Sequence, residues 1–578
     1  MLLIAAALAG LAAVPAAATS SSRGAGAQIT AQSLLMPGVF YQREVDFTPH
    51  GPVVLDIVTA PRPDGSLYTL APALSNNAIV GTETLTGVEK DVTATTTTVG
   101  VNGDFFAANP GSPVGLLMRG GALDQAPAIG RSSVGFAPDG TLTVARVAFD
   151  GTWRGTSQRR QLDLNEAPVA GHTTLYTSAW GSTTPPESDV VADVISSFPA
   201  ATPNRVLNGT VSQQLGQGGV AIPAGGAVLV ARGGQAPHLQ AEAPVGTNVE
   251  VRLTLTPDWS GMSSGLGGGP LLVSDGKPVF RANEAFGDPV LNQRGARSAV
   301  GQLGDGRILL VTVEGGGSAY SVGMTNYELA VALARHGAIT AIGLGSGPSA
   351  AMAFDGTLLT KPAAAAEQPI SDALLLSYSG VYAAPPASDV LSPNGDGVDD
   401  TESFAFKLVR AAQVTATLTA PDGSTRTLAQ DAEQPGIHTL DWSGEGAAEG
   451  SWRFTVAATD DQGRTTTAER TFALNNTLGS LVAAPAQAQL RPKARDVLAA
   501  TFNLTHPANV TATVENRAGI VAATLLSRKL NAGPQRIVWD GRTSTGSLAQ
   551  TGEYEVRVVA TNSIGTASLV SRFIARRS

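Results

Sequence analysis

Three charged side chains near the ends of expected strands are the first candidates for chemistry in this chain. Glu314 follows a buried-looking strand, and Asp104 lies in the segment from Val101 to Phe106. Carboxylates in such places can serve as general acid and base. Arg297 could bind a phosphate, because its planar guanidinium matches two phosphate oxygens at once. The simpler alternatives are a solvated strand end for Glu314 and a surface ion pair for Arg297.

A second candidate site is a loop rich in Asn, Asp and Gly. It reads Ser392-Pro393-Asn394-Gly395-Asp396-Gly397-Val398-Asp399-Asp400. Asn394, Asp396 and Asp399 could bind calcium, which prefers oxygen ligands. The EF-type pattern needs an acid where Ser392 stands and a bidentate Glu where Ser403 stands, and neither is present. A turn that opens a domain is therefore the favoured interpretation, with calcium as the alternative.

Composition excludes several other kinds of site. The chain has no cysteine, so disulfides, thiol catalysis and thiolate metal sites are absent. His172 and His336 stand alone, and no His/Asp/Glu cluster has zinc spacing. The net charge of −9 comes without any run of Lys or Arg, which argues against nucleic acid as a partner. No cofactor is expected beyond the calcium alternative.

One helix is evident among the elements that must position these residues. Thr325 and Glu328 form a capping box, Leu329 and Leu333 share one helical face, and Gly337 can end the helix. Expected strands at 307–313 and 341–344 flank it. This β–α–β unit, inside a region of short strands and Gly-rich turns, predicts an α+β domain with a mixed, strand-rich sheet.

The rear third contains an internal repeat. A Trp-bearing strand, Gly436 to Trp442 or Gly533 to Trp539, is followed in each copy by an alternating strand. Copies of about a hundred residues with this pattern predict two all-β Ig-like sandwiches, at 390–476 and 477–578. Both resemble the Ig-like domain of the flagellar hook-capping protein.

The chain is expected to be exported and divided into several domains, because 578 residues exceed the size of a single core. Residues 1–18 are predicted to be a signal peptide, with an apolar run and small residues for cleavage. No Lys or Arg precedes that run, so a retained anchor is the alternative. A flexible leader at 19–35, a main domain at 36–384 and a linker at 385–389 complete the predicted organisation. A secreted or cell-surface location follows.

Several segments of residues 36–384 resemble, in chain order, the phosphodiester glycosidase family. They are Val101-Asn102-Gly103-Asp104-Phe105-Phe106, Pro113-Val114-Gly115, Tyr176-Thr177-Ser178-Ala179-Trp180-Gly181, Gly267-Gly268-Gly269-Pro270-Leu271-Leu272-Val273, Arg297-Ser298-Ala299-Val300-Gly301 and Val313-Glu314-Gly315-Gly316. This family comprises bacterial relatives of the lysosomal N-acetylglucosamine phosphodiester α-N-acetylglucosaminidase. The expected helix from Asn326 to His336 falls in its family position.

The resemblance breaks down at the last family motif. The family usually has Asn-Leu-Asp-Gly-Gly-Gly-Ser-Ser where this chain has Gly343-Leu344-Gly345-Ser346-Gly347-Pro348-Ser349-Ala350. Gly345 replaces the family acid, and Gly316 replaces a family arginine. These departures remove one carboxylate and one guanidinium from the pocket that the resemblance implies.

The resemblance implies hydrolysis of sugar phosphodiesters, such as N-acetylglucosamine α-phosphodiesters of envelope glycopolymers. The implied catalytic acid is Glu314, and the implied substrate-binding residues are Asn102, Arg297, Gly345, Ser346 and Gly347. Asp104 stands where the family often has Gly, so it is a further catalytic candidate from its own residue type and place. Asn102 has a simpler alternative role, tying a strand end by hydrogen bonds. The alternative function is a catalytically degenerate protein that binds a glycan, a sugar phosphate or a cell-wall polymer. A structural role for the rear sandwiches as spacers is a third hypothesis.

Overall fold

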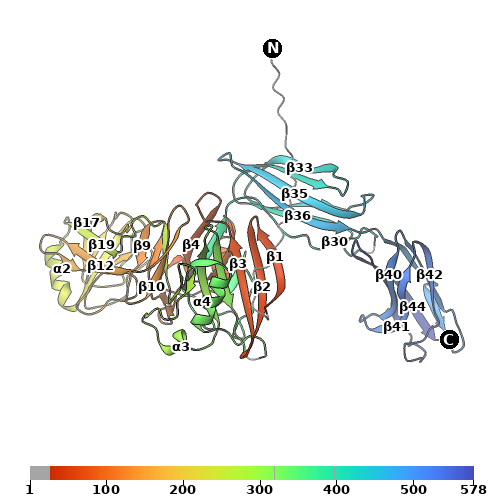
Figure 1. Cartoon of the computed structure of the whole chain (residues 1–578). Helices are drawn as coiled ribbons and strands as arrows, with labels where there is room; N and C mark the ends of the chain where they lie inside the picture. The colour runs from red at the N-terminus through yellow and green to blue at the C-terminus, as the bar shows by residue number, and fades with distance from the viewer. Residues whose placement is uncertain (1–26, 318, 396, 578) are drawn as a thin grey trace, which may run out of the picture.

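The computed structural model describes residues 27–317, 319–395 and 397–577 (Figure 1). Strands make up 52% and helices 6% of the structure, so the chain is mostly β, and the predicted α+β class overstates its helix. Within the described ranges no helix is long and apolar enough to cross a membrane. The predicted signal peptide, residues 1–18, lies outside the described residues.

An eight-stranded sheet, the main sheet, forms the centre of the front region. Its order is β1-β2-β3-β24-β23-β25-β21-β22. The bounds are β1 Gln28–Met36, β2 Val39–Thr48, β3 Gly51–Ala60, β24 Ile308–Val313, β23 Arg297–Leu303, β25 Ala338–Gly343, β21 Leu271–Ser274 and β22 Lys277–Pro278. Its strand pairs are antiparallel, which corrects the predicted mixed sheet. The two strands that flank the helix do not pair, because β23 lies between them.

Helix α4 (Asn326–Arg335) covers one face of the main sheet and confirms the predicted capping box. Thr325 accepts the backbone N–H of Glu328 at 3.3 Å, and Glu328 accepts the N–H of Thr325 at 2.9 Å. Leu329 and Leu333 pack on that face with Val313. The reciprocal caps satisfy backbone donors that would otherwise be unpaired, which fixes where the helix begins.

The other face of the main sheet packs against two five-stranded sheets, and a second eight-stranded sheet lies beyond them. The first five-stranded sheet has the order β27-β26-β5-β28-β4, and the other five-stranded sheet has the order β11-β10-β20-β8-β9. The second eight-stranded sheet, called the distal sheet, has the order β13-β12-β19-β17-β16-β18-β15-β14. Their bounds are β4 Tyr68–Leu74, β5 Thr97–Asn102, β26 Met352–Phe354, β27 Thr357–Leu358, β28 Asp372–Tyr378; β8 Leu117–Arg119, β9 Ala122–Gln125, β10 Ser132–Phe136, β11 Leu142–Arg146, β20 Ser264–Gly267; β12 Ala148–Arg154, β13 Arg160–Gln161, β14 Asp163–Leu164, β15 Thr173–Thr177, β16 Val190–Ile195, β17 Val206–Leu215, β18 Ala227–Arg232 and β19 Asn248–Thr256. The smaller elements are η1 Ser75–Asn77, η2 Gly233–Gln235, α1 Leu85–Val92, α2 Ala236–Glu242, α3 Asp288–Leu291, β6 Phe106–Ala107 and β7 Ser112–Pro113.

The rear third repeats one arrangement twice. The first copy has sheets β29-β31-β34 and β30-β36-β35-β32-β33, and the second has β37-β39-β42 and β38-β44-β43-β40-β41. The bounds are β29 Tyr382–Ala383, β30 Val390–Leu391, β31 Glu402–Leu408, β32 Ala412–Thr419, β33 Thr425–Glu433, β34 Gly436–Trp442, β35 Gly450–Asp460, β36 Thr465–Leu474; β37 Leu478–Ala484, β38 Gln487–Leu490, β39 Leu498–Leu504, β40 Ala508–Asn516, β41 Val521–Leu530, β42 Gly533–Trp539, β43 Gly552–Thr561 and β44 Thr566–Arg577.

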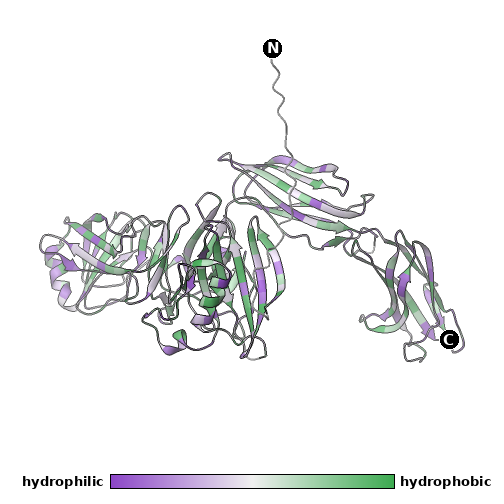
Figure 2. Cartoon of the chain, in the orientation of Figure 1, coloured by the Kyte–Doolittle hydropathy of each residue, from purple (hydrophilic) through white to green (hydrophobic). Residues whose placement is uncertain are grey.

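Each copy is held by one core between its two sheets. In the first copy, Phe404 on β31 stacks on Phe454 on β35 with ring centroids 4.6 Å apart. In the second copy, the ring centroids of Trp539 on β42 and Phe573 on β44 lie 5.6 Å apart. Figure 2 shows hydrophobic and hydrophilic residues alternating along these strands. The period of two places one side of every strand in the core and the other in water.

Two predicted boundaries differ from the structure. Residues 28–35, expected as part of a flexible leader, form most of β1 and pair with β2. Tyr382 and Ala383, expected at the end of the main domain, pair with β31 of the first rear copy. Both segments lack charged residues and are rich in small or apolar ones. Each forms the edge strand of a sheet, where its backbone groups find hydrogen-bond partners.

Candidate functional site

Strand alternation separates two of the predicted site residues, Arg297 and Glu314. Arg297 pairs with Val313, whose side chain packs in the core beneath α4. Glu314 is the next residue, so its side chain leaves the opposite face, where it contacts Arg43. Because successive side chains of a strand point to opposite faces, the main sheet lies between them. The structure therefore does not bring Arg297 and Glu314 into one pocket.

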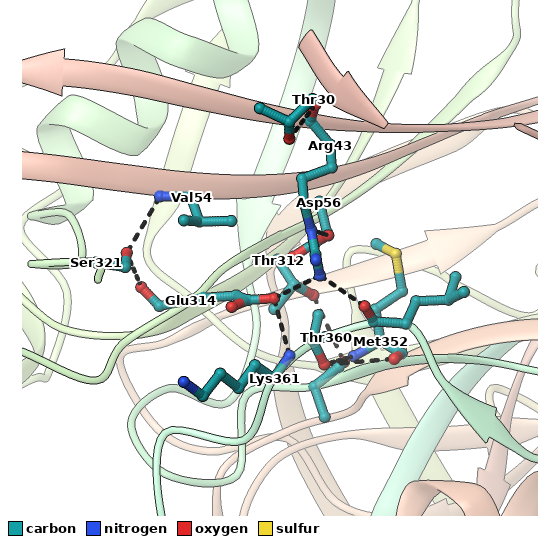
Figure 3. Close-up of polar contacts among 12 residues, drawn as sticks. Thr30, Arg43, Val54, Asp56, Thr312, Glu314, Ser321, Met352, Thr360 and Lys361 are labelled. Atoms are coloured by element: carbon teal, nitrogen blue, oxygen red, sulfur yellow. Dashed lines mark hydrogen bonds and ion pairs between the residues drawn. The ribbon is translucent and has the colours of Figure 1, made fainter. Parts of the chain in front are cut away.

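Glu314 lies in a buried charged cluster between the main sheet and the loop that follows β27 (Figure 3). Its Oε1 accepts hydrogen bonds from Arg43 Nη2 and from the backbone N–H of Lys361, each at 2.8 Å. The hydroxyl of Tyr320 donates to Oε2. Arg43 also donates through Nε to Asp56 Oδ1 at 2.9 Å. Each oxygen of Glu314 thus has a donor from the protein.

Asp56 and Glu314 form a carboxyl pair that shares Arg43. Burial and the nearby carboxylate of Glu314 raise the pKa of Asp56, and the hydrogen bond from Tyr41 and the charge of Arg43 oppose this shift. The cluster anchors the end of β24, and the catalytic role of Glu314 stays a prediction.

Arg297 is buried and binds backbone rather than an acid. Its Nη2 donates to the carbonyl oxygens of Val290 at 3.1 Å and Gln293 at 2.6 Å, with a longer contact to Pro289 at 3.4 Å. Its Nε has no hydrogen-bond partner in the described structure. Burial lowers the pKa of this guanidinium. Arg297 therefore holds the segment 279–296, which contains α3, against the start of β23 in the middle of the main sheet.

Asn102 joins β5 to the degraded family loop. Its Nδ2 donates to the carbonyl oxygen of Gly345 at 2.9 Å, and its Oδ1 accepts from Ser298 Oγ at 2.5 Å and from the N–H of Ala351 at 3.1 Å. All of its side-chain groups are used within the protein. This geometry matches the simpler prediction for Asn102, a residue that ties a strand end.

The loop from Gly345 to Gly347 packs tightly against the segment that carries Asp104. A Cβ at position 345 would lie 2.8 Å from the carbonyl oxygen of Asp104 and 2.9 Å from Asn102 Nδ2. The family acid therefore has no room on this backbone path. The N–H groups of Gly345 and Gly347 donate to the carbonyl oxygens of Gly103 and Ala296 at 2.8 and 3.0 Å. Half-buried Ser346 lies between them, and the phosphate-binding role of these three residues stays a prediction.

Asp104 is a buried carboxylate where several family segments meet. Its Oδ1 accepts the N–H of Phe105 at 2.7 Å, and its Oδ2 accepts the N–H of Gly115 at 2.6 Å. A side chain at Gly115 or Gly267 would collide with this carboxylate, so both glycines are required for the close approach. Burial, and secondarily the charge of Asp372, raise the pKa of Asp104 to about 7. That value suits proton transfer near neutral pH.

Arg131 lies over the ring of Phe105, the residue that follows Asp104, and the sequence analysis did not single it out. Its charge opposes the upward shift in the pKa of Asp104. Its guanidinium lies 4.3 Å from the ring centroid of Phe286 and 5.5 Å from that of Phe105, and its Nε donates to the carbonyl oxygen of Ala285 at 3.2 Å. Within the described structure its two terminal nitrogens make no hydrogen bond or ion pair. They are available to an anionic ligand.

A sequence signal for Arg131 existed. Arg131-Ser132-Ser133-Val134-Gly135 repeats Arg297-Ser298-Ala299-Val300-Gly301 almost residue for residue. Both arginines hold the segment 279–296, Arg131 at Ala285 and Arg297 at Val290 and Gln293. A search for internal repeats in the front region would have paired the two arginines.

The predicted calcium loop is organised by a residue outside the proposed ligand set. Asp400 Oδ1 accepts the N–H groups of Asn394 and Gly395 at 2.9 and 2.7 Å, and its Oδ2 accepts that of Gly397 at 2.6 Å. Asp396 lies outside the described residues. No group of three His, Cys, Asp or Glu side chains in the described ranges has the geometry of a metal site. These contacts support the turn, and the calcium site stays a prediction.

Two family profiles match parts of the chain. The phosphodiester glycosidase profile matches residues 201–377, and the FlgD Ig-like domain profile matches residues 489–563. The first range contains Arg297, Glu314 and the Gly345 loop. Asn102, Asp104 and Arg131 lie outside it.

Similar proteins cover only part of this chain. The SPbeta prophage-derived uncharacterized protein YomE of Bacillus subtilis is 33% identical over 107 residues, which are 18% of this chain and 16% of YomE. A hypothetical protein from Synechocystis is 26% identical, with a TM-score of 0.49. The matched part is 59% of this chain and 62% of the Synechocystis chain. The catalytic domain of zebrafish N-acetylglucosamine-1-phosphodiester alpha-N-acetylglucosaminidase, auto-inhibited by its pro-peptide, has 14% identity and a TM-score of 0.34, covering 61% of this chain and 88% of its own. Residues 201–377 thus belong to a phosphodiester glycosidase domain, and residues 489–563 to an Ig-like domain of the FlgD type.

Proposed function

We propose that the front region hydrolyses sugar phosphodiesters, with Asp104 as the proton-transfer group and Arg131 as the phosphate ligand. One observation carries this proposal: a buried carboxyl with a pKa of about 7 lies beside an arginine whose terminal nitrogens are free, at the meeting point of the family segments. Glu314, favoured by the resemblance, has both oxygens engaged within the protein, and Arg297 is buried with its Nη2 bound to backbone carbonyl oxygens.

The reaction needs one water and one proton acceptor. Water attacks the anomeric carbon, the bond from that carbon to the phosphate oxygen breaks, and the phosphate monoester leaves with the bonding electrons. Asp104 accepts the proton of the attacking water in its ionised form, and the N–H groups of Phe105 and Gly115 hold the carboxylate in place. Arg131 stabilises the negative charge of the leaving phosphate. Phosphate is a good leaving group, so a second carboxylate is less necessary than in ordinary glycosides.

The alternative function is binding without turnover. One observation favours binding without turnover. Gly345 stands where the family has an acid, and the backbone there lies too close to Asp104 and Asn102 to carry a side chain. In this alternative the same Arg131 and Asp104 hold a glycan or sugar phosphate that is not cleaved. We further propose that the protein acts outside the cell on envelope glycopolymers, with the two rear copies as Ig-like sandwiches that hold the front region away from, or against, the surface.

The decisive experiment incubates the full chain with an N-acetylglucosamine α-phosphodiester of a simple alcohol and measures released sugar. Asp104→Asn should lower release by about 100-fold or more, because proton-transfer groups contribute on that scale. Asp193→Asn is the matched control, since Asp193 is also buried with a pKa raised to about 7 but lies on β16 in the distal sheet. Equal activity of wild type and Asp104→Asn would reject the assignment. Binding of the diester without release would establish the alternative.

A further inference from the structure

Two exposed aromatic side chains meet beside the segment 279–296. Phe280 is 69% exposed and Tyr327, in the first turn of α4, is 44% exposed. Their ring centroids lie 5.1 Å apart at an interplanar angle of 89°. Exposed apolar side chains that gather in one place, unlike those scattered singly, often mark a binding site.

These two rings line one pocket with a volume of about 520 Å³. The lining comes from the family strand at Pro270 and Leu271, from the segment 279–296 and from the start of α4. This volume falls in the range of sites for small ligands. The pocket is distinct from the Asp104 site, because Phe280 faces Tyr327 whereas Phe286 of the same segment faces Phe105 and Arg131.

The polar groups in this pocket are unusually free. Arg281 has no acidic partner in the described structure and only lies over the Phe280 ring, 5.5 Å from its centroid. The side chain of Asn283 makes no hydrogen bond there either. Asn292 uses only Nδ2, which donates to Asp288 Oδ1 at 2.8 Å, so its Oδ1 remains available. The pocket thus offers a cation, two amides and two aromatic faces.

We propose that this pocket binds a saccharide that carries a negative charge. A pyranose ring presents an apolar C–H face, which suits an aromatic ring, and a hydroxyl edge, which suits amide donors and acceptors. Arg281 is the charged lining residue and lacks a counter-ion, so it selects an anionic substituent such as phosphate or carboxylate. An apolar peptide would leave Arg281 and both amides unsatisfied. The inference concerns binding alone and needs no turnover at Asp104.

The test measures affinity by calorimetry with the full chain carrying Asp104→Asn, so that cleavage at the proposed active site cannot consume the ligand. The probe is a glycerol phosphate polymer substituted with N-acetylglucosamine. Phe280→Ala and Tyr327→Ala should each raise Kd about tenfold or more. Val331→Ala is the matched control, because Val331 is an exposed apolar residue (42%) one turn further along α4 and does not line the pocket. It should leave Kd unchanged.

Two further probes separate the parts of the proposal. Arg281→Gln should weaken binding of the charged polymer and leave affinity for a neutral N-acetylglucosamine trisaccharide unchanged. The unsubstituted glycerol phosphate polymer should bind at least tenfold more weakly than the substituted one. The proposal is overturned if the substituted polymer does not bind, if it binds equally well without its sugar, or if neither aromatic substitution changes Kd.

Discussion

Two strands of the front region begin with almost the same five residues, yet their arginines have different environments. Arg297 starts β23 in the middle of the main sheet and is buried against backbone carbonyls, with only 4% of its surface exposed. Arg131 precedes β10 in a smaller sheet and lies half-buried on an aromatic ring beside Asp104. Both hold the segment 279–296, but only Arg131 keeps its terminal nitrogens free. The same short motif therefore produces a strand in both places, whereas the role of its first side chain depends on the tertiary environment.

The largest expected effect concerns the stability provided by Arg297. Arg297→Ala should lower the free energy of unfolding of the front region by about 3 kcal/mol, because it leaves a cavity and deprives buried carbonyl groups of their donor. Thermal unfolding followed by circular dichroism measures the change. Arg131→Ala serves as the comparison and should cost less than about 1 kcal/mol, as expected for a partly exposed cation–π contact. Equal losses in both variants would remove the distinction between the two arginines.

The next effect concerns activity and reverses the order of the two residues. Arg131→Ala should lower kcat/KM for the N-acetylglucosamine phosphodiester about 100-fold, because the phosphate loses its charge-stabilising donor. Arg146→Ala is the control, since Arg146 also binds the segment 279–296, through the carbonyl oxygens of Ala282 and Asn283, but carries no proposed contact with substrate. A loss of similar size in Arg146→Ala would show that holding the segment is all that Arg131 does.

The pH dependence of stability tests the environment of Asp104, the carboxyl group near Arg131. Its folded pKa of about 7 exceeds the unfolded value of about 3.9, so the folded state binds an extra proton between these values. Stability should therefore fall as pH rises from 4 to 7, by at most about 1.4 kcal/mol per pH unit for this group. Asp104→Asn should flatten the slope measured by urea unfolding across that range. An unchanged slope would contradict the raised pKa.

The smallest expected effect is on the aromatic support of Arg131. Phe286→Leu removes the ring 4.3 Å from the guanidinium and should raise KM about threefold with little change in kcat, since a cation–π contact at a partly exposed site contributes about 0.5–1 kcal/mol. Steady-state kinetics measures both constants. Phe149→Leu is the matched control, because Phe149 is a partly buried phenylalanine on β12 of the distal sheet, away from both proposed sites. A change in kcat alone would assign Phe286 a role other than positioning Arg131.

Much of the fold could be predicted because its signals are local. The capping box of Thr325 and Glu328 fixes the start of α4 through contacts within one turn. The repeated strands that end in Trp442 and Trp539 indicate two equivalent rear copies, which the sheet orders confirm. The mixed pairing predicted around α4 was wrong, because no local signal says that β23 lies between the two strands flanking α4. A parallel pair, β14 with β15, lies instead in the distal sheet.

The site was predicted less well, because its members meet through distant contacts. Asp104 was singled out, but its partner Arg131 was missed, and Glu314 proved to belong to a cluster with Asp56 and Arg43 from β3 and β2. Loss of the family acid at Gly345 was visible in the sequence. Only the structure showed the reason, which is that the loop lies too close to Asp104 and Asn102 to carry a side chain.

The sequence by itself determined the start of the helix after Thr325, that the rear third is a duplicated β arrangement, and which family the front region resembles. These properties depend on periodicity, capping and turn residues, which act over a few positions. The tertiary structure alone decided that Arg297 and Glu314 face opposite sides of a sheet and that Arg131 lies beside Asp104. The physical reason is that burial and pairing across more than a hundred residues set the charge, the pKa and the free donors of a side chain, and no short stretch of sequence contains them.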